Sequence, residues 1–292
     1  MTDSEVPYSP GQRAQWSSET AFVFSMTAAT VGLGNLWRFP YMVGENGGGA
    51  FIVAYLIALV LVALPTMMME VGIGRLVQGS VVGTFRTVKR FGNLYGWFVV
   101  MLTIAITSYY LVITGWTMGY AVSAFCMAVQ PFDDFTGGYN SLWYFFAVTV
   151  LATAVLIRGV SAIEKLSKIL MPVLVLMIIG IVISAARMDG WEEARSFMFV
   201  ADYSHLKSPT IWLFAFGQAF YTLAIGQGYL ITYGSYIPQQ TNIPRACLIV
   251  TGTETSIALL AGFMIFPFVF TYGFDPGAGS QLAFDTHPRV FL

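Results

Sequence analysis

Residues 31–40 read VGLGNLWRFP and interrupt the first long apolar segment of the chain. Two glycines and an amide stand there in place of the Leu, Ile or Val of a helix that faces lipid. Glycine costs a helix interior about 1 kcal/mol relative to alanine, and unpaired backbone is tolerated at membrane depth only where protein or a water-filled cavity satisfies it. Close packing of helices through small residues is the alternative explanation. The pattern favours a helix that begins before residue 31 and unwinds around Gly32 and Gly34.

The composition of the whole chain is that of a membrane protein. Of its 292 residues, 57% are apolar or aromatic and 10% are charged, against about 25% charged in soluble domains. Charge-free runs of the length that a bilayer span needs predict an all-α, multi-span protein with seven helices near residues 20–43, 50–74, 93–124, 141–157, 166–187, 210–236 and 245–272. The lipid bilayer is therefore an expected partner. A net charge of -1 leaves no basic face for nucleic acid.

Basic residues between the predicted spans indicate the orientation of the chain. If the N-terminus is cytoplasmic, nine Lys and Arg residues lie inside and four outside. The nine are Arg13, Arg75, Arg86, Lys89, Arg90, Arg158, Lys165, Lys168 and Arg245, and the four are Arg187, Arg195, Lys207 and Arg289. Because basic residues accumulate in cytoplasmic loops, we expect a multi-pass protein of the cytoplasmic membrane with residues 1–19 inside. Residues 188–209 then form an extracellular loop and residues 273–292 an extracellular C-terminal segment.

The sixth predicted span contains a second interruption. Residues 217–228 read GQAFYTLAIGQG within an otherwise apolar stretch, five spans after the first interruption. Paired glycine-interrupted helices at corresponding places in two halves are typical of the binding site of an inverted-repeat transporter. We expect both helices to be broken at mid-membrane.

Charged residues inside predicted spans are candidates for function. Arg38 and Glu70 lie near helix ends, where each could be structural, but Glu254 lies about a third of the way into the seventh span. A carboxylate at that depth needs a cation, a proton or a strong donor beside it. Glu254 is therefore a candidate ion-site residue. His205 and His287 have no partners at metal spacing, and no nucleotide or catalytic motif is present, so we expect no enzyme activity and no organic cofactor.

Residues 31–40, followed by ENGGGAF at 45–51, closely resemble the signature of the neurotransmitter:sodium symporter family. Supporting matches lie at Glu70 with Gly74-Arg75, at residues 109–110 (YY), 115–119 (GWTMG), 217–223 (GQAFYTL) and 233–236 (YGSY). The resemblance implies a LeuT-type fold of two inverted five-helix repeats that couples sodium to uptake of an amino acid or amine. Residues 20–187 would form the first repeat and 210–272 the first two helices of the second, while relatives have eleven or twelve spans.

The chain is therefore expected to be C-terminally incomplete, and a truncated, non-transporting membrane fragment is one alternative. A seven-span receptor is another, although such receptors begin outside the cell. The preferred amino acid, the sodium stoichiometry and association into homo-oligomers stay open.

The resemblance assigns roles to individual residues of this chain. Thr30, Asn35, Thr222 and Glu254 resemble ligands of a first sodium ion, and Ala28 and Val31 resemble backbone ligands of a second. Substrate contacts are expected from Thr30, Leu33, Gly34, Ile106, Tyr110, Tyr221, Thr222, Ala224 and Gln227. Arg38 resembles the outer gate, and Arg13, Trp16 and Tyr236 resemble members of the inner gate.

Two departures from relatives bear on the cargo. Gly32 stands where amine-selective relatives place an aspartate, which favours a substrate that brings its own carboxylate, an amino acid. Gln227 replaces a more usual apolar residue and could bond a polar side chain. The chloride site of relatives corresponds to Tyr55, Gln218, Thr222, Glu254 and Ala258, in which Glu254 replaces an asparagine and Ala258 a serine. We therefore expect chloride-independent transport.

Overall fold

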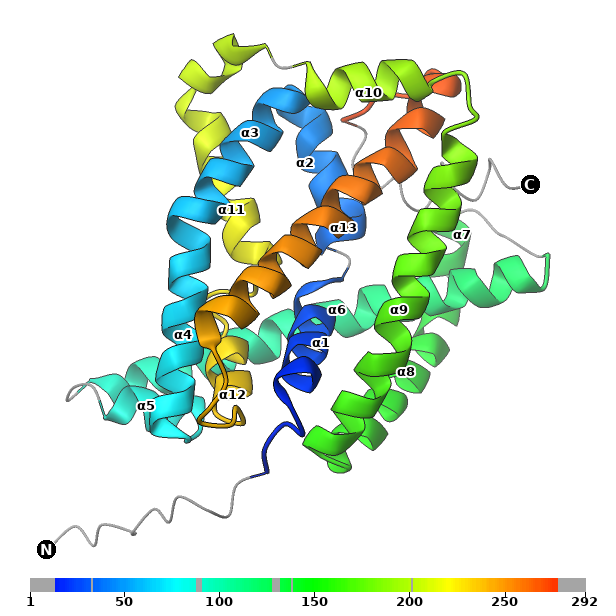
Figure 1. Ribbon diagram of the computed structural model, residues 1–292. Helices are drawn as coiled ribbons and strands as arrows, with labels where there is room; N and C mark the ends of the chain where they lie inside the picture. Colours follow the sequence, from blue (N-terminus) through cyan, green and yellow to red (C-terminus); the bar gives the residue numbers. More distant parts are fainter. Residues whose placement is uncertain are drawn as a thin grey trace, which may run out of the picture.

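The structure is a computed structural model that describes residues 14–32, 34–87, 91–127, 132–137, 139–200 and 202–277, and throughout these ranges it contains helices and no strands (Figure 1). The first part holds α1 (Glu19–Thr30), the π-helix η1 (Gly34–Arg38), α2 (Phe39–Glu45), α3 (Gly49–Ala58), the π-helix η2 (Leu59–Ala63), α4 (Leu64–Val77) and α5 (Val81–Arg86). The middle holds α6 (Gly92–Phe125), α7 (Phe132–Gly137), α8 (Asn140–Ile157), α9 (Val160–Ala185) and α10 (Trp191–Phe199). The 3₁₀ helix η3 (Tyr203–Lys207), α11 (Pro209–Thr222), α12 (Tyr229–Gly234) and α13 (Ile243–Thr271) complete the described chain.

In the described part of the chain, five helical segments are long and apolar enough to cross a membrane. They are residues Gly49–Val77, Gly92–Phe125, Asn140–Ile157, Val160–Ala185 and Ile243–Thr271. The first and sixth predicted spans are instead divided, into α1 and α2 and into α11 and α12, so no single piece reaches spanning length. The expectation of an all-helical protein with its first and sixth spans broken is confirmed.

The first break begins where the last turn of α1 closes. Val31 N donates to Thr27 O at 2.8 Å, and Val31 is extended with φ -85° and ψ 114°. Gly32 N then donates to Asn35 Oδ1 at 3.1 Å, so the Asn35 side chain satisfies a backbone donor that the helix has released. The chain winds up again as η1 and continues into α2. The sequence therefore provides both the glycine that loosens the helix and the amide that bonds the freed backbone.

The second break depends on backbone that bends to positive φ. Gly226 and Gly228 have φ of 78° and 76°, and Ala224 has a φ of 53°. Glycine adopts this region without steric cost, whereas a residue with a Cβ is strained there. Positive φ at two glycines and one strained alanine thus bends the backbone between α11 and α12.

Helix α13 lies at the centre of the fold and packs against α1, α2, α4, α9 and α10 (Figure 1). Beside it, α12 lies directly on α4. A Cβ on Gly74 would lie 2.2 Å from Ile231 O, and a Cβ on Gly234 would lie 2.4 Å from Val71 O. Only glycine allows these backbones to touch, and this contact fixes α12 below the second break.

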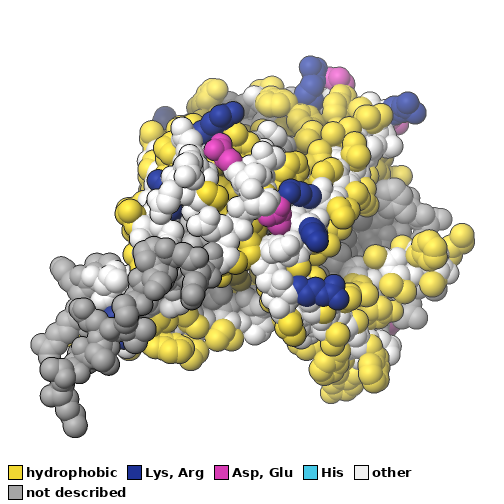
Figure 2. All heavy atoms as spheres, turned by 60° about the horizontal axis from the view of Figure 1, so that its bottom comes forward, with side chains coloured by type: hydrophobic (Ala, Val, Ile, Leu, Met, Phe, Trp, Pro, Cys, Tyr) yellow, Lys and Arg dark blue, Asp and Glu magenta, His cyan; other side chains and the backbone are white. Residues whose placement is uncertain are grey.

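Large apolar side chains cover much of the outer surface (Figure 2). Helix α8 buries none of its residues, and Trp143 and Ile157 are 78% and 80% exposed. A water-soluble protein does not expose apolar surface on this scale. The protein is therefore embedded in a membrane.

The fifth predicted span, 166–187, begins too late in the sequence. Helix α9 starts at Val160, and within it Glu164 and Lys168 lie one turn apart and form an ion pair at 2.6 Å. Glu164 also accepts hydrogen bonds from Ser17 N, at 3.1 Å, and from Ser17 Oγ. Charges that looked like a loop are thus accommodated within a helix that is tied to the start of α1.

Candidate functional site

The two breaks lie against one another. Asn35 Nδ2, just after the first break, donates to Thr222 Oγ1 at 3.1 Å, and Thr222 is the last residue of α11. Gln218 Nε2 on α11 donates to Gly34 O at 3.2 Å. Direct hydrogen bonds therefore join the residues that flank the two breaks, with no layer of other side chains between them.

A buried carboxylate lies beside this junction. Glu254 on α13 has no exposed surface, and its Oε1 accepts hydrogen bonds from Asn35 Nδ2 and Thr222 Oγ1. Its Oε2 accepts from Tyr55 OH and from Thr255 Oγ1, each at 3.3 Å. Of the side chains that the structure describes, no Lys, Arg or His forms an ion pair with it. Four neutral donors stabilise the carboxylate, but its charge is left for a cation to balance.

The residues predicted to hold sodium divide into two groups. Thr30, Asn35, Thr222 and Glu254 are all buried at the junction of the breaks. Ala28 and Val31 instead line a groove between α1 and α9. Hydroxyl, amide and carboxylate oxygens suit a hard cation, and the second candidate set, Ala28 and Val31, flanks Thr30 in the sequence but lines the groove beside α9. Their roles as ligands stay predictions.

A cavity of about 550 Å³ extends from the junction along α1 and α12. Eight predicted substrate residues line it, namely Thr30, Gly34, Ile106, Tyr110, Tyr221, Thr222, Ala224 and Gln227. Leu33 lies outside the described residues. Residues from α1, α6, α11 and the second break are thus gathered around one volume of the size of a small-molecule site.

Two tyrosines and an arginine cover the cavity on the side of α2. Tyr110 OH and Tyr221 OH lie 2.8 Å apart and share a hydrogen bond. The Arg38 guanidinium lies 4.7 Å from the centre of the Tyr221 ring, and its Nη1 donates to Gln218 Oε1. Arg38 is therefore held over the Tyr221 ring by a cation–π contact and a hydrogen bond. This predicted gate residue thus contacts Tyr221, which lines the cavity.

The opposite end of the cavity is formed around Trp16. This side chain is buried, its Nε1 donates to Tyr233 O at 3.1 Å, and its backbone N donates to Tyr236 O at 3.0 Å. The Trp16 and Tyr236 rings meet edge to face. Two of the three predicted inner-gate residues are thus in contact, and Arg13 lies outside the described part of the chain.

Several polar contacts at the second break were not expected from the sequence. Glu70 Oε1 accepts from Gly226 N at 2.8 Å, and Thr103 Oγ1 donates to Gln227 O at 2.6 Å. Thr107 Oγ1 and Tyr229 OH lie 2.8 Å apart. The spacing of Thr103 and Thr107, one turn apart on an apolar helix, is the signal that could have identified them.

Comparison with known proteins identifies relatives over nearly the whole chain. The model of the sodium:neurotransmitter symporter family matches residues 13–142 and 134–275. An uncharacterised sodium-dependent transporter of Haemophilus influenzae is 34% identical, over 96% of this chain and 66% of the relative. The uncharacterised sodium-dependent transporter YhdH of Bacillus subtilis is 34% identical, over 95% of this chain and 64% of its own length. The human sodium- and chloride-dependent GABA transporter 2 is 25% identical, over 96% of this chain and 56% of its own length.

A solved structure is similar as well. The crystal structure of MhsT in complex with L-phenylalanine superposes with a TM-score of 0.87 at 36% identity, over 95% of this chain and 66% of MhsT. The chain spans about two thirds of the length of MhsT and of the two bacterial relatives.

Proposed function

This chain belongs to the sodium:neurotransmitter symporter family, and we propose that it carries out sodium-coupled symport of an amino acid across the cytoplasmic membrane. The observation that carries the proposal is the carboxylate of Glu254, buried where the two breaks meet and without a basic partner among the described residues. A sodium ion held by the oxygens of Thr30, Asn35 and Thr222 would balance that charge. The family leaves the seven-span receptor without support.

An amino acid suits the cavity better than an amine. Gly32 lines the cavity, and a Cβ at this position would meet no atom within 4 Å, so there is room for a substrate group but no fixed acid. The substrate's own carboxylate would complete the sodium shell and accept a hydrogen bond from Tyr110 OH. An amine substrate has no carboxylate, so the space beside Gly32 would contain no negative charge.

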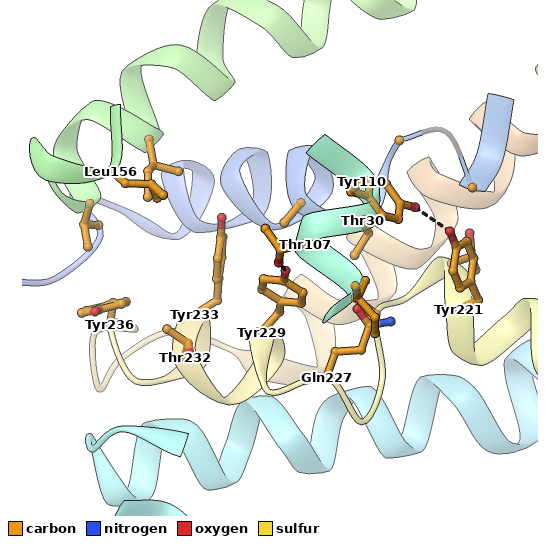
Figure 3. Close-up of a pocket in the computed structure, with 18 of the residues that line it drawn as sticks. Thr30, Thr107, Tyr110, Leu156, Tyr221, Gln227, Tyr229, Thr232, Tyr233 and Tyr236 are labelled. Carbon is orange, nitrogen blue, oxygen red and sulfur yellow. Dashed lines mark hydrogen bonds between the residues drawn. The ribbon is translucent and has the colours of Figure 1, made fainter. Parts of the chain in front are cut away.

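The side-chain end of the cavity combines apolar and polar groups. Ile106, Tyr221 and Ala224 provide apolar and aromatic surface, and Gln227 adds an amide that Figure 3 shows between Tyr229 and Tyr221. An amide in such a wall favours a side chain that can form a hydrogen bond. We therefore expect neutral amino acids with a polar side chain to compete well for the site.

Glu254 makes the transport independent of chloride in this proposal. The donors that would hold a chloride ion, Tyr55 and Thr222, already donate to the carboxylate. An anion next to a carboxylate would be repelled. The fixed charge thus takes the place of the chloride ion.

Basic residues support a cytoplasmic N-terminus. Figure 2 views the molecule from the end where α1 begins, and Lys and Arg side chains are numerous on that face. Arg158 follows α8, Lys165 and Lys168 lie in the first three turns of α9, and Arg245 lies in the first turn of α13. The orientation follows from the excess of basic residues on cytoplasmic loops.

Uptake into proteoliposomes tests the function. The full-length protein would be reconstituted and offered each labelled amino acid with an inward sodium gradient, with chloride or with gluconate. We expect uptake of at least one amino acid that requires sodium, proceeds equally in gluconate and is lost in Thr222→Val. Uptake that is equal in sodium and in potassium would contradict the coupling to sodium. Uptake that requires chloride would contradict the chloride independence.

A further inference from the structure

Helix α6 presents three hydroxyl groups to the second break. Thr103, Thr107 and Tyr110 follow the spacing of one helix face. Thr103 Oγ1 donates to Gln227 O at 2.6 Å, Thr107 Oγ1 lies 2.8 Å from Tyr229 OH, and Tyr110 OH lies 2.8 Å from Tyr221 OH. One face of α6 therefore contacts the end of α11, the middle of the break and the first residue of α12.

The bridge between Thr107 and Tyr229 lies partway along the cavity (Figure 3). Thr30, Tyr110 and Tyr221 lie on one side of it, and Tyr233, Tyr236 and Leu156 lie on the other. All of these residues line the same cavity. The first side is the compartment at the breaks, and the second is a vestibule next to Trp16.

We propose that Tyr229 is a positioning residue that retains the substrate, because its hydroxyl bridge to Thr107 narrows the cavity between the compartment at the breaks and the vestibule. The proposal rests on the proposed function, in which the substrate occupies that compartment. The substrate leaves towards Trp16 only when the bridge opens. Tyr110 and Tyr221 form the corresponding bridge at the other end, so hydroxyl pairs on one face of α6 bound the compartment on both sides.

The strength of the bridge suits a contact that opens during transport. Both groups are neutral, and Thr107 is exposed to the cavity. A neutral hydrogen bond of this kind contributes about 1 kcal/mol, which corresponds to about fivefold in an equilibrium constant. The hydroxyl of Thr103, which donates to Gln227 O and to Val99 O of its own helix, does not take part in the bridge.

The test compares Tyr229→Phe, Thr107→Val and the double variant in the full-length protein. Thr114→Val is the matched control, because Thr114 Oγ1 on the same helix donates only to Tyr110 O of its own helix, at 2.7 Å. The first measurement is the dissociation rate, in nanodiscs, of the labelled amino acid that the wild-type protein transports. The second measurement uses the variant Ala224→Cys in a Cys126→Ser background. Cys126 is replaced because it is exposed and would react with the reagent, whereas Cys247 is buried and is kept. This second experiment measures, in sealed inverted membrane vesicles that expose the side where α1 begins, the rate at which an impermeant thiol reagent modifies residue 224.

We expect each single variant to release the amino acid about fivefold faster, and the double variant to release it no faster than either single one, because both substitutions remove one bond. Thiol modification should accelerate by the same factor, and Thr114→Val should change neither rate. Release at the wild-type rate in both single variants, or a roughly 25-fold effect in the double variant, would overturn the proposal. If the wild-type protein binds no amino acid in sodium, the proposed function fails, and the thiol measurement still decides whether the bridge narrows the cavity.

Discussion

Replacing Glu254 by glutamine removes a buried charge while nearly preserving the shape of the side chain. A cation bound to Thr222 Oγ1 at about 2.4 Å, a usual distance between a hard cation and oxygen, would lie about 5 Å from the carboxylate that the same hydroxyl contacts. At an effective dielectric constant of about 20, two unit charges at that distance attract by about 3 kcal/mol. Glu254→Gln should therefore raise the sodium Kd roughly 150-fold in chloride-free buffer.

The assay titrates sodium against binding of the labelled substrate to the purified protein in gluconate. Tyr55→Phe is the matched control, because it removes one hydrogen bond to the same carboxylate and leaves the charge. That variant should shift the sodium Kd by about fivefold at most. Chloride should restore part of the affinity of Glu254→Gln and change nothing in the wild-type protein. A sodium Kd within threefold of wild type in Glu254→Gln would refute the role of the carboxylate.

Three further predictions concern the substrate and the packing of the helices. Tyr110→Phe should weaken substrate binding by about 2 kcal/mol, roughly 30-fold, because a hydrogen bond to a carboxylate is lost. Tyr221→Phe removes hydroxyl contacts with Tyr110 and Tyr109 but keeps the Tyr110 hydroxyl, so it should cost less in the same equilibrium binding assay. Gln227→Leu should change the affinity ratio of polar to apolar competing amino acids of similar size by about fivefold in favour of the apolar ones. An unchanged order of competitors would contradict a hydrogen bond from Gln227 to the substrate side chain. Gly74→Ala should lower the free energy of unfolding in detergent by about 1–3 kcal/mol through overpacking against α12. Gly72→Ala should leave it unchanged, because a Cβ on Gly72 meets no atom within 4 Å.

The two breaks and the buried acid could be predicted because each violates a rule of membrane helices within a few residues of sequence. Gly32 and Gly34 interrupt an apolar run, and Gly226 and Gly228 do so again. A carboxylate inside a span is costly wherever it occurs, so Glu254 can be identified as a candidate without knowing which residues surround it. Local departures of this kind need no knowledge of the fold.

The partners of these groups could not be predicted from the residues alone, because they come from distant parts of the chain, and only the family resemblance grouped Tyr55 and Thr222 with Glu254. Glu254 accepts hydrogen bonds from Tyr55 and Thr222, which lie 199 and 32 residues away. Thr107 and Tyr229 are 122 residues apart. A hydroxyl on an apolar helix bonds equally well to its own backbone one turn earlier, as Thr114 does. Only the packing of α6 beside the second break decides which hydroxyls turn towards a partner.

The π-helices show a similar limit at shorter range. η1 ends at Arg38, two residues before Pro40, and η2 ends at Ala63, two residues before Pro65. Proline lacks a backbone donor and its ring clashes with the carbonyl of the preceding turn, and a widened π turn relieves both effects. Yet Pro172 lies inside α9 and Pro267 inside α13 with no π turn before either. Proline therefore marks where a helix must adjust, and the neighbouring helices determine whether it widens. At η1 the widened turn carries both Asn35 and Arg38, so the adjustment that proline requires also places the amide at the junction of the breaks and the guanidinium over Tyr221.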